Sequence, residues 1–417
     1  MPEGPIRAPG SGSAAGLLRE IASTGIDPVR GGYSRPVFST AEQDLRQWFA
    51  GAASARGLEV TTDRNGTIWA WWNPRGHPLE GSVVTGSHLD SVPGGGQFDG
   101  PLGVASALAA VDHLVTRGTT PRRALAIAVF GEEEGSRFGV ACLGSRLMAG
   151  AIDPDRARNL RDQQGDTFAD VCAASGVDPD RLGRDDEALR RIGAFVELHV
   201  EQGRSLIDVG EPVAVGSSIL GHGRWKLTVS GQGNHAGTTL MADRRDPMVA
   251  AARTIVAIRD GAAAQKGARA TVGRVAPVPG GTNVIASRVD LWLDVRHPDD
   301  AATAALVEDL HARARVIAAE EGCTASLSEE SYSGTVHFSS PLRQRLSAVL
   351  PHAPVLETGA GHDAGVLAPH VPTAMLFVRN PTGVSHSPEE YVEDEDAERG
   401  AVALADCLEA LLVSDGG

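Results

Sequence analysis

The chain has 417 residues, of which 42% are hydrophobic, and its 38 lysines and arginines stand against 53 aspartates and glutamates, a formal net charge of −15. Nucleic acids and anionic membranes attract basic surfaces, so this balance excludes both as main partners and leaves small molecules or other proteins. The length allows two or three domains, each with a hydrophobic core.

The cysteines and the N-terminus indicate the compartment. The four cysteines are widely spaced and include no CxxC pair, so they predict no disulfide framework. The N-terminal residues lack the apolar segment of a secretory signal, and no apolar run is long enough to span a membrane. We therefore expect a soluble, cytoplasmic protein whose residues 1–30 are partly flexible.

The predicted elements after this segment alternate between helices and strands. Ser39–Glu42 resembles a capping box and precedes an amphipathic helix. Strands are expected at 82–85, 124–130 and 194–200, and helices at 101–117 and 139–149. Alternation of this kind predicts an α/β domain with a mostly parallel sheet and helices on both faces.

Residues 211–330 show a different pattern, a compact strand–helix–strand–strand–helix–strand series that is typical of a ferredoxin-like α+β domain. Its predicted strands are 224–230, 268–275, 284–295 and 323–328, and its predicted helices are 247–260 and 299–320. The first pattern resumes with a helix at 341–350, a strand at 374–378 and a C-terminal helix at 399–413. We therefore expect residues 211–330 to be inserted into a larger domain formed by 31–210 and 331–417.

Polar residues follow the first predicted strand. His88, Asp90 and Asp99 lie in a glycine-rich loop at its carboxyl end, where open α/β sheets bind ligands. Both His88 and Asp99 can reach one metal ion from this loop, and Asp90 can accept the second ring N–H of His88 and fix its tautomer. Alternatively, the loop is a polar segment whose side chains cap the following helix.

Three consecutive glutamates, Glu132, Glu133 and Glu134, follow the second strand. Such a run is costly unless a cation lies among the carboxylates, but acids also stabilise the N-terminus of a following helix for purely structural reasons. Taken alone, the run favours the structural explanation.

A third strand end carries Glu197, His199 and Glu201 on one face, since side chains of a strand alternate. A buried histidine held by a carboxylate is one explanation of this pattern. His386 lies in a turn-forming loop after the predicted strand 374–378.

Four strand ends of one sheet thus each present histidine or carboxylate side chains. This is the inventory of a two-metal hydrolytic site with nitrogen and oxygen ligands. None of the cysteines lies in these loops, which excludes a cysteine-rich zinc site.

Beyond its N-terminal segment, the chain resembles the dimetal amidohydrolases of the aminoacylase and glutamate carboxypeptidase clan. The similar branch contains N-carbamoyl-L-amino acid hydrolases, β-ureidopropionases and allantoate amidohydrolases. The motifs that carry the resemblance are GSHLDS, GGGQFDGPLG, EEEGSRFG, ELHVEQG, GQGNHAGTT, GGTNVI, GAGHDAG and SHSPEE.

The resemblance implies two divalent metal ions per subunit, zinc, manganese, cobalt or nickel. It assigns His88 and His199 to one metal, Glu134 and His386 to the other, and Asp99 to both. Glu133 is implied as the general base, with Glu132 as the competitor for that role, and Asp90 as the residue that orients His88.

The resemblance also implies a homodimer in which the inserted domain is a lid that completes the partner's active site. It assigns catalytic or substrate contacts to His235 and Asn283 of that domain and a substrate-carboxylate contact to Arg296. Read in isolation, Arg296 is a surface arginine at a strand end. Gln202 and His362 complete the substrate pocket by the same resemblance.

The expected activity is hydrolysis of the ureido C–N bond of allantoate or an N-carbamoyl-L-amino acid, with release of ammonia and carbon dioxide. Two alternatives remain. One is an aminoacylase or dipeptidase of the same clan, against which the HxEQG motif at His199 argues. The other is a non-catalytic binding protein of the same fold.

Overall fold

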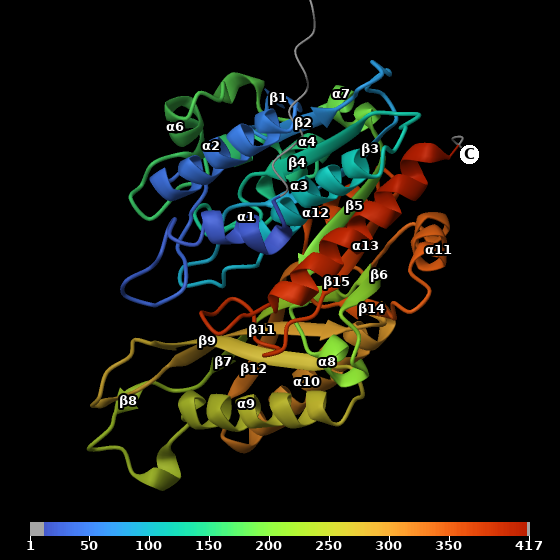
Figure 1. Cartoon of the computed structure of the whole chain (residues 1–417). Coiled ribbons are helices and arrows are strands. Elements are labelled where there is room, and N and C mark those ends of the chain that lie inside the picture. Colours follow the sequence, from blue (N-terminus) through green and yellow to red (C-terminus); the bar gives the residue numbers. More distant parts are fainter. Residues whose placement is uncertain (1–11, 415–417) are drawn as a thin grey trace, which may run out of the picture. The chain divides into compact units, whose positions relative to one another are not determined.

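The computed structural model describes residues 12–414, and their chain divides into two compact units (Figure 1). One unit contains the described residues up to Ser218 together with those from His337 onward, and the other is Ile219–Val336. The inserted unit thus begins and ends a few residues later than the predicted bounds 211–330.

The described part of the first unit is built on a nine-stranded sheet with the order β1-β2-β4-β3-β5-β15-β6-β13, in which β14 also pairs with β6. The four central strands β4, β3, β5 and β15 are mutually parallel. Every residue of β3, β4 and β15 is buried, as expected for a sheet covered on both faces. The strands are β1 (Glu59–Thr62), β2 (Ile68–Trp72), β3 (Ser82–His88), β4 (Leu125–Phe130), β5 (Ile192–Val200), β6 (Val213–Ile219), β13 (Val336–His337), β14 (Val355–Thr358) and β15 (Thr373–Val378).

Helices cover both faces of this sheet, which confirms the predicted α/β class. One face packs against α1 (Ala14–Glu20), α2 (Thr40–Ala55), α3 (Pro101–Thr116), α11 (Ser340–Val349) and α13 (Asp394–Val413). The other side carries α4 (Leu143–Ala149), α5 (Pro154–Arg158), α6 (Phe168–Ala174), α7 (Asp186–Arg191) and α12 (Asp363–Leu367). α3 and α13 lie side by side (Figure 1).

Helix α1 lies in the segment that we expected to be partly flexible. Leu17, Leu18 and Ile21 are almost completely buried, and the helix packs against α3 and α13. Helix α1 is therefore part of the core, whereas later residues of the segment, such as Ile26 and Val29, are exposed. Residues 1–11 of the predicted segment lie outside the described residues.

The predicted capping box forms only in part. The Ser39 side chain accepts a hydrogen bond from the Glu42 backbone N–H, but the Glu42 carboxylate binds the N–H of Phe38 rather than that of Ser39. The same carboxylate contacts Arg46 at 2.5 Å. The helix predicted at 139–149 begins only at Leu143, because the preceding residue, Cys142, adopts a left-handed backbone conformation.

The second unit is a four-stranded antiparallel sheet with the order β12-β7-β11-β9, covered on one face by two helices (Figure 1). This is the ferredoxin-like order expected from the sequence. The predicted strand 284–295 is split, because residues 284–285 pair with a separate short strand. The elements are β7 (Gly221–Ser230), α9 (Pro247–Ala263), β9 (Arg269–Val278), β11 (Arg288–His297), α10 (Asp300–Glu320), β12 (Thr324–Ser333), and the pair β8 (Asn234–His235) and β10 (Val284–Ile285).

Between residues 12 and 414, the helices are all too short or too polar to cross a lipid bilayer.

Candidate metal centre

Histidine and carboxylate side chains gather where the four central parallel strands end. His88 is the last residue of β3, His199 is the penultimate residue of β5, Glu134 follows β4, and His386 lies in the loop after β15. Strand direction brings these ends to one edge of the sheet. Gly100, at the start of α3, has a φ of 83°, and a side chain there would collide with the His88 ring.

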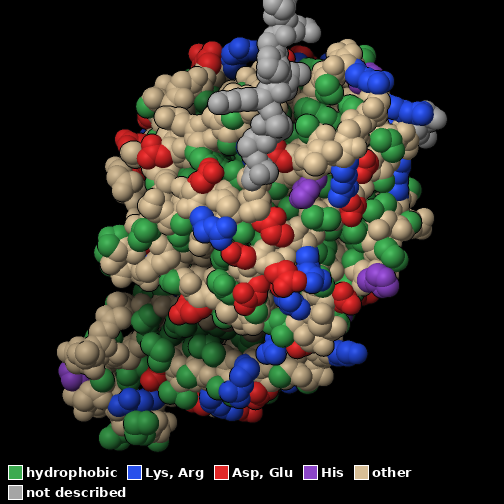
Figure 2. Space-filling model, viewed as in Figure 1, with side chains coloured by type: hydrophobic (Ala, Val, Ile, Leu, Met, Phe, Trp, Pro, Cys, Tyr) green, Lys and Arg blue, Asp and Glu red, His purple; other side chains and the backbone are tan. Residues whose placement is uncertain are grey.

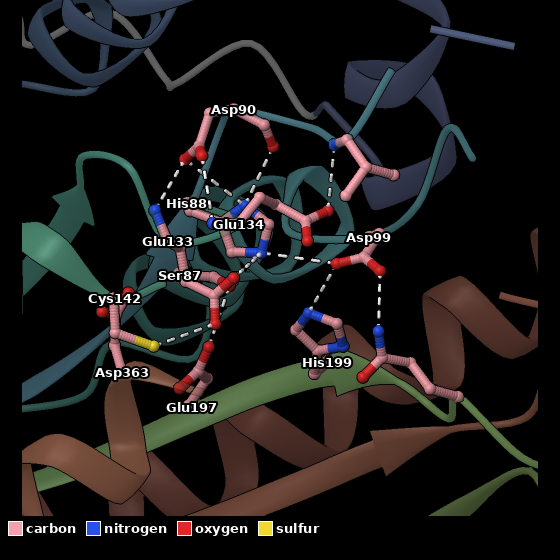
Figure 3. A network of polar contacts seen from close by, with 12 residues as sticks. Ser87, His88, Asp90, Asp99, Glu133, Glu134, Cys142, Glu197, His199 and Asp363 are labelled. Atoms are coloured by element: carbon pink, nitrogen blue, oxygen red, sulfur yellow. Dashed lines mark hydrogen bonds and ion pairs between the residues drawn. The ribbon is translucent and has the colours of Figure 1, made fainter. Parts of the chain in front are cut away.

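One group of potential metal ligands consists of His88, Asp99 and His199, all buried (Figure 3). The Nδ1 atoms of His88 and His199 contact backbone carbonyl oxygens at 3.0 and 2.9 Å, which fixes each ring with Nε2 as the atom free to bind a metal. Both Nε2 atoms are buried without a hydrogen bond, and they lie 3.4 and 3.1 Å from Asp99 Oδ1. Buried nitrogens without partners are costly, so this donor set fits a cation.

A second group consists of Asp99, Glu134 and His386. His386 Nε2 lies 3.2 Å from Glu134 Oε2 and 3.4 Å from Asp99 Oδ2. Asp99 therefore belongs to both groups and offers a different oxygen to each. The Gln202 amide donates to the same Oδ2 atom at 2.8 Å, and the Gln202 Oε1 atom is buried without a partner.

The charges of this cluster are strongly perturbed. Burial alone would raise the pKa of the Asp99 carboxyl, but the histidines around it, His199 foremost, hold that pKa well below its usual range. Burial raises the pKa of Glu133 well above its usual value, with neighbouring carboxylates adding to the shift. Such opposite shifts in one pocket are typical of functional sites.

Glu132 and Glu133, the two candidates for the base, lie in different surroundings. The Glu132 carboxylate accepts hydrogen bonds from the backbone N–H groups of Arg137 and Phe138 and so holds the following turn. Glu133 Oε2 lies 3.6 Å from His88 Nε2, beside the metal-ligand groups. Glu132 therefore stabilises a turn of the backbone, whereas Glu133 lies next to the potential metal ligands.

Three non-glycine residues in or beside this cluster have positive φ angles, namely 54° at Glu132, 55° at Cys142 and 56° at His386. Only one other non-glycine residue among residues 12–414 does so, Phe38. This conformation costs free energy in residues other than glycine, and such strain concentrates at functional sites.

Asp90 contacts His88 in another way than expected. The His88 Nδ1 atom lies 3.0 Å from the backbone carbonyl oxygen of Asp90, and the Asp90 carboxylate is 3.7 Å away. That carboxylate instead accepts the backbone N–H groups of Glu133 and Glu134, at 3.2 and 3.1 Å. Both carboxylate oxygens of Asp90 therefore accept hydrogen bonds from these N–H groups. Asp90 thus joins the loop after β3 to the glutamate loop, residues 132–134 after β4 (Figure 3).

The three polar residues at the end of β5 have separate surroundings. Glu197 is buried and accepts hydrogen bonds from Ser87 and from the Ala364 backbone. Glu201 accepts the N–H groups that open helix α8 (Ser205–Val209). The predicted strand face therefore contributes His199 to the group with His88 and Asp99, and Glu197 forms a third potential ligand group with His199 and His362, whereas Glu201 holds the start of α8.

His362 lies beside this cluster, with its ring centroid 4.4 Å from that of His199. It is buried, and neither of its ring nitrogens has a hydrogen-bond partner among the described residues. Burial and the nearby His199 lower its pKa well below the usual value, so the imidazole is neutral.

His235, Asn283 and Arg296 belong to the inserted unit. β8 and β10 bring the first two together, and the Ala236 N–H donates to the Asn283 carbonyl oxygen at 3.0 Å. Arg296, on β11, binds Asp294 of the same strand through two contacts of 2.7 and 3.0 Å.

Several buried polar residues at the cluster were given no role by the sequence analysis. Asp363, next to His362, accepts a 2.5 Å hydrogen bond from Ser145, and the Cys142 thiol lies 3.4 Å from Glu133 Oε1. Glu390 accepts the backbone N–H groups of Phe98 and Asp99. The motifs GAGHDAG and SHSPEE contain two of these residues, but motif membership does not say which side chains are buried.

The chain is similar to proteins of one known family. A family model described as "Peptidase family M20/M25/M40" matches residues 84–410. The chain belongs to this family. This M20/M25/M40 chain is 37% identical to an N-carbamoyl-L-amino acid amidohydrolase of Geobacillus stearothermophilus, over 93% of the chain and 95% of that protein.

Two further comparisons agree with this placement. The M20/M25/M40 chain is 33% identical to an allantoate amidohydrolase of Escherichia coli K12, over 92% of the chain and 94% of that protein. A crystal structure of an amidase of the hydantoinase/carbamoylase family from Burkholderia multivorans superposes with a TM-score of 0.86 at 30% identity, covering 97% of this chain and 98% of that one.

Proposed function

We propose that this chain is a metal-dependent amidohydrolase that cleaves the ureido C–N bond of allantoate or an N-carbamoyl-L-amino acid. The observation that supports this most directly is the pair of ligand groups sharing Asp99, each with a histidine Nε2 directed at that carboxylate. Relatives named for both substrates cover nearly the whole chain. For an N-carbamoyl-L-amino acid, addition of water yields the amino acid, carbon dioxide and ammonia.

The donor set fits two divalent cations, one held by His88, His199 and Asp99 and the other by Glu134, His386 and Asp99. Imidazole and carboxylate ligands suit zinc, manganese, cobalt or nickel. When bound, such a pair polarises the scissile carbonyl and lowers the pKa of a water molecule.

Glu133 is the proposed general base. Its carboxylate accepts a proton from the attacking water and returns it to the leaving nitrogen, which requires a pKa raised toward neutrality. Burial raises the pKa of Glu133, which is the direction that this role requires. Asp90 supports the step by fixing the backbone of the glutamate loop.

The substrate contacts are proposed on the same basis. The unpartnered Oε1 of Gln202 can accept a ureido N–H, and the neutral His362 ring can hydrogen-bond the substrate. Arg296 can bind the substrate carboxylate through its planar guanidinium, which Asp294 already orients. His235 and Asn283 are proposed to stabilise the developing oxyanion.

We also propose that the chain is a homodimer whose inserted unit completes the partner's site. Leu240 and Met241, which lie between β8 and α9 of that unit, are both more than two-thirds exposed. Figure 2 shows hydrophobic side chains on the surface of that part of the unit. Exposed apolar groups of this kind are common at subunit interfaces. A cytoplasmic location is proposed because all four cysteines are free and buried.

A substrate panel tests the proposed activity. Metal-free protein is reloaded with zinc, manganese, cobalt or nickel, and ammonia release is measured with allantoate, several N-carbamoyl-L-amino acids and one N-carbamoyl-D-amino acid. A dipeptide and an N-acetyl amino acid are assayed for amine release. We expect turnover of a ureido acid and none of the dipeptide. Hydrolysis of the dipeptide with inert ureido acids would refute the proposal.

A further inference from the structure

Glu390 connects two loops that carry potential metal ligands. Its side chain is buried in the segment that follows His386, yet its Oε1 atom accepts the backbone N–H groups of Phe98 and Asp99 at 3.1 and 3.0 Å. Its Oε2 atom accepts the Ser385 hydroxyl at 3.0 Å. One carboxylate therefore binds the residue that both ligand groups share and the neighbour of His386.

Packing around Glu390 supports the same connection. The side chain fills the space next to Gly96, where a methyl group would collide with the carboxylate. The ring of Tyr391, the next residue, makes an edge-to-face contact with Phe98 at a centroid distance of 6.0 Å. The segment after His386 is thus fastened to the Asp99 loop by polar and by apolar contacts.

The two ligand groups depend on this connection to different degrees. His88 and His199 lie on buried central strands, and backbone carbonyl groups hold their rings. His386 lies in a loop, has a φ of 56°, and its side chain remains 49% exposed. The group formed by Asp99, Glu134 and His386 therefore relies on Glu390 for the distance between His386 and Asp99.

We propose that Glu390 is a positioning residue that sets the affinity of the metal site formed by Asp99, Glu134 and His386. This inference rests on the proposed two-metal function and adds a residue to it. Partners that orient metal ligands typically change metal affinity about 10–100-fold when they are replaced.

The variants are chosen to weaken the connection in steps. Glu390→Gln keeps one oxygen for the two N–H groups but places an amide donor against Ser385, so we expect a partial effect. Glu390→Ala removes all these contacts and should have the larger effect. Gly96→Ala pushes the intact carboxylate away from its place. Glu389→Gln is the matched control, because Glu389 is exposed and its carboxylate accepts a hydrogen bond from the Ser387 hydroxyl.

Equilibrium dialysis of the full-length, metal-free protein against Co²⁺ gives the affinity of each site, and the visible absorption of bound Co²⁺ reports its coordination. We expect wild type and Glu389→Gln to bind two ions. In Glu390→Ala and Gly96→Ala one site, which we assign to Asp99, Glu134 and His386, should lose about 10–100-fold in affinity, while the other site changes less than about threefold. Excess Co²⁺ should restore most of the turnover of Glu390→Gln.

Two outcomes would overturn the proposal. One is unchanged binding of both ions in Glu390→Gln and Gly96→Ala. These two variants test the proposal even if Glu390→Ala does not fold. The other is a parallel loss of both ions together with a lower melting temperature of the metal-free variants, as a purely structural role predicts. Binding of fewer than two ions by wild type would instead count against the proposed function.

Discussion

At the level of single residues, the site combines imidazole rings in fixed tautomers with carboxylates of two kinds, which differ in the groups that they contact. Asp90, Glu201 and Glu132 bind backbone N–H groups, whereas Asp99 and Glu133 face the bare Nε2 atom of His88. Acids that are adjacent in the sequence thus differ in what they contact. This difference leads to a testable distinction between Glu132 and Glu133.

Replacement of Glu133 by glutamine should abolish turnover without removing the metals. The amide cannot accept a proton, so we expect kcat to fall about 10²–10⁴-fold or more, with two metal ions still bound. Glu132→Gln is the control and should retain kcat within about tenfold, because Glu132 holds a turn through backbone hydrogen bonds. Steady-state kinetics and metal analysis on both variants check this. Near-wild-type activity of Glu133→Gln would transfer the base role to another residue.

At the scale of elements, the short helix α1 shows how packing overrides local sequence character. Seven residues are too few for a stable isolated helix. The helix persists because Leu17 and Leu18 enter the core beside α3 and α13 and because Ser13 caps its first turn. We therefore attribute to α1 a share in the stability of the larger unit.

Leu17→Ala should lower the free energy of unfolding by about 2–5 kcal/mol, since it removes a fully buried side chain. Arg19→Ala is the matched control on the same helix. Arg19 forms an ion pair with Asp394, and the two side chains are 63% and 71% exposed, respectively. Such exposed pairs contribute about 1 kcal/mol or less. Denaturant unfolding of both variants checks the difference. Equal, small effects would mean that α1 contributes little to the stability of the fold.

At the scale of the whole molecule, the proposed function requires residues from two compact units. The metal ligands belong to the larger unit, whereas His235, Asn283 and Arg296 belong to the inserted one. If the inserted unit serves the partner's site, defects in the two units should compensate each other in a hybrid dimer.

We expect co-refolding of His88→Ala with His235→Ala to restore about a quarter of wild-type activity, because half of the dimers are hybrids with one intact site. The control is His88→Ala with Glu133→Gln, since both defects then lie in the same unit and no hybrid contains an intact site. Ammonia release from the best ureido substrate measures the result. No recovery in the first mixture would refute a site shared between subunits.

The α/β class, the inserted ferredoxin-like unit and the family could all be predicted from the amino-acid sequence. Hydrophobic periodicity is a local property, and the ligand motifs occupy strand ends whose common edge follows from parallel strand order. His88, Asp99, His199, Glu134 and His386 could be predicted as ligands because their motifs resemble those of a dimetal family, whereas the run Glu132–Glu134 by itself favours a structural explanation.

The hydrogen-bond partners of these residues could not be predicted, because they depend on tertiary packing. Nothing local shows that α1 is buried, that the backbone of Asp90 rather than its carboxylate binds His88, or that Glu390 reaches Asp99 across almost 300 residues of chain. Contacts of this kind depend on where loops from distant strands meet. Sequence periodicity specifies the faces of elements, whereas packing between elements specifies which buried carboxylate accepts which donor.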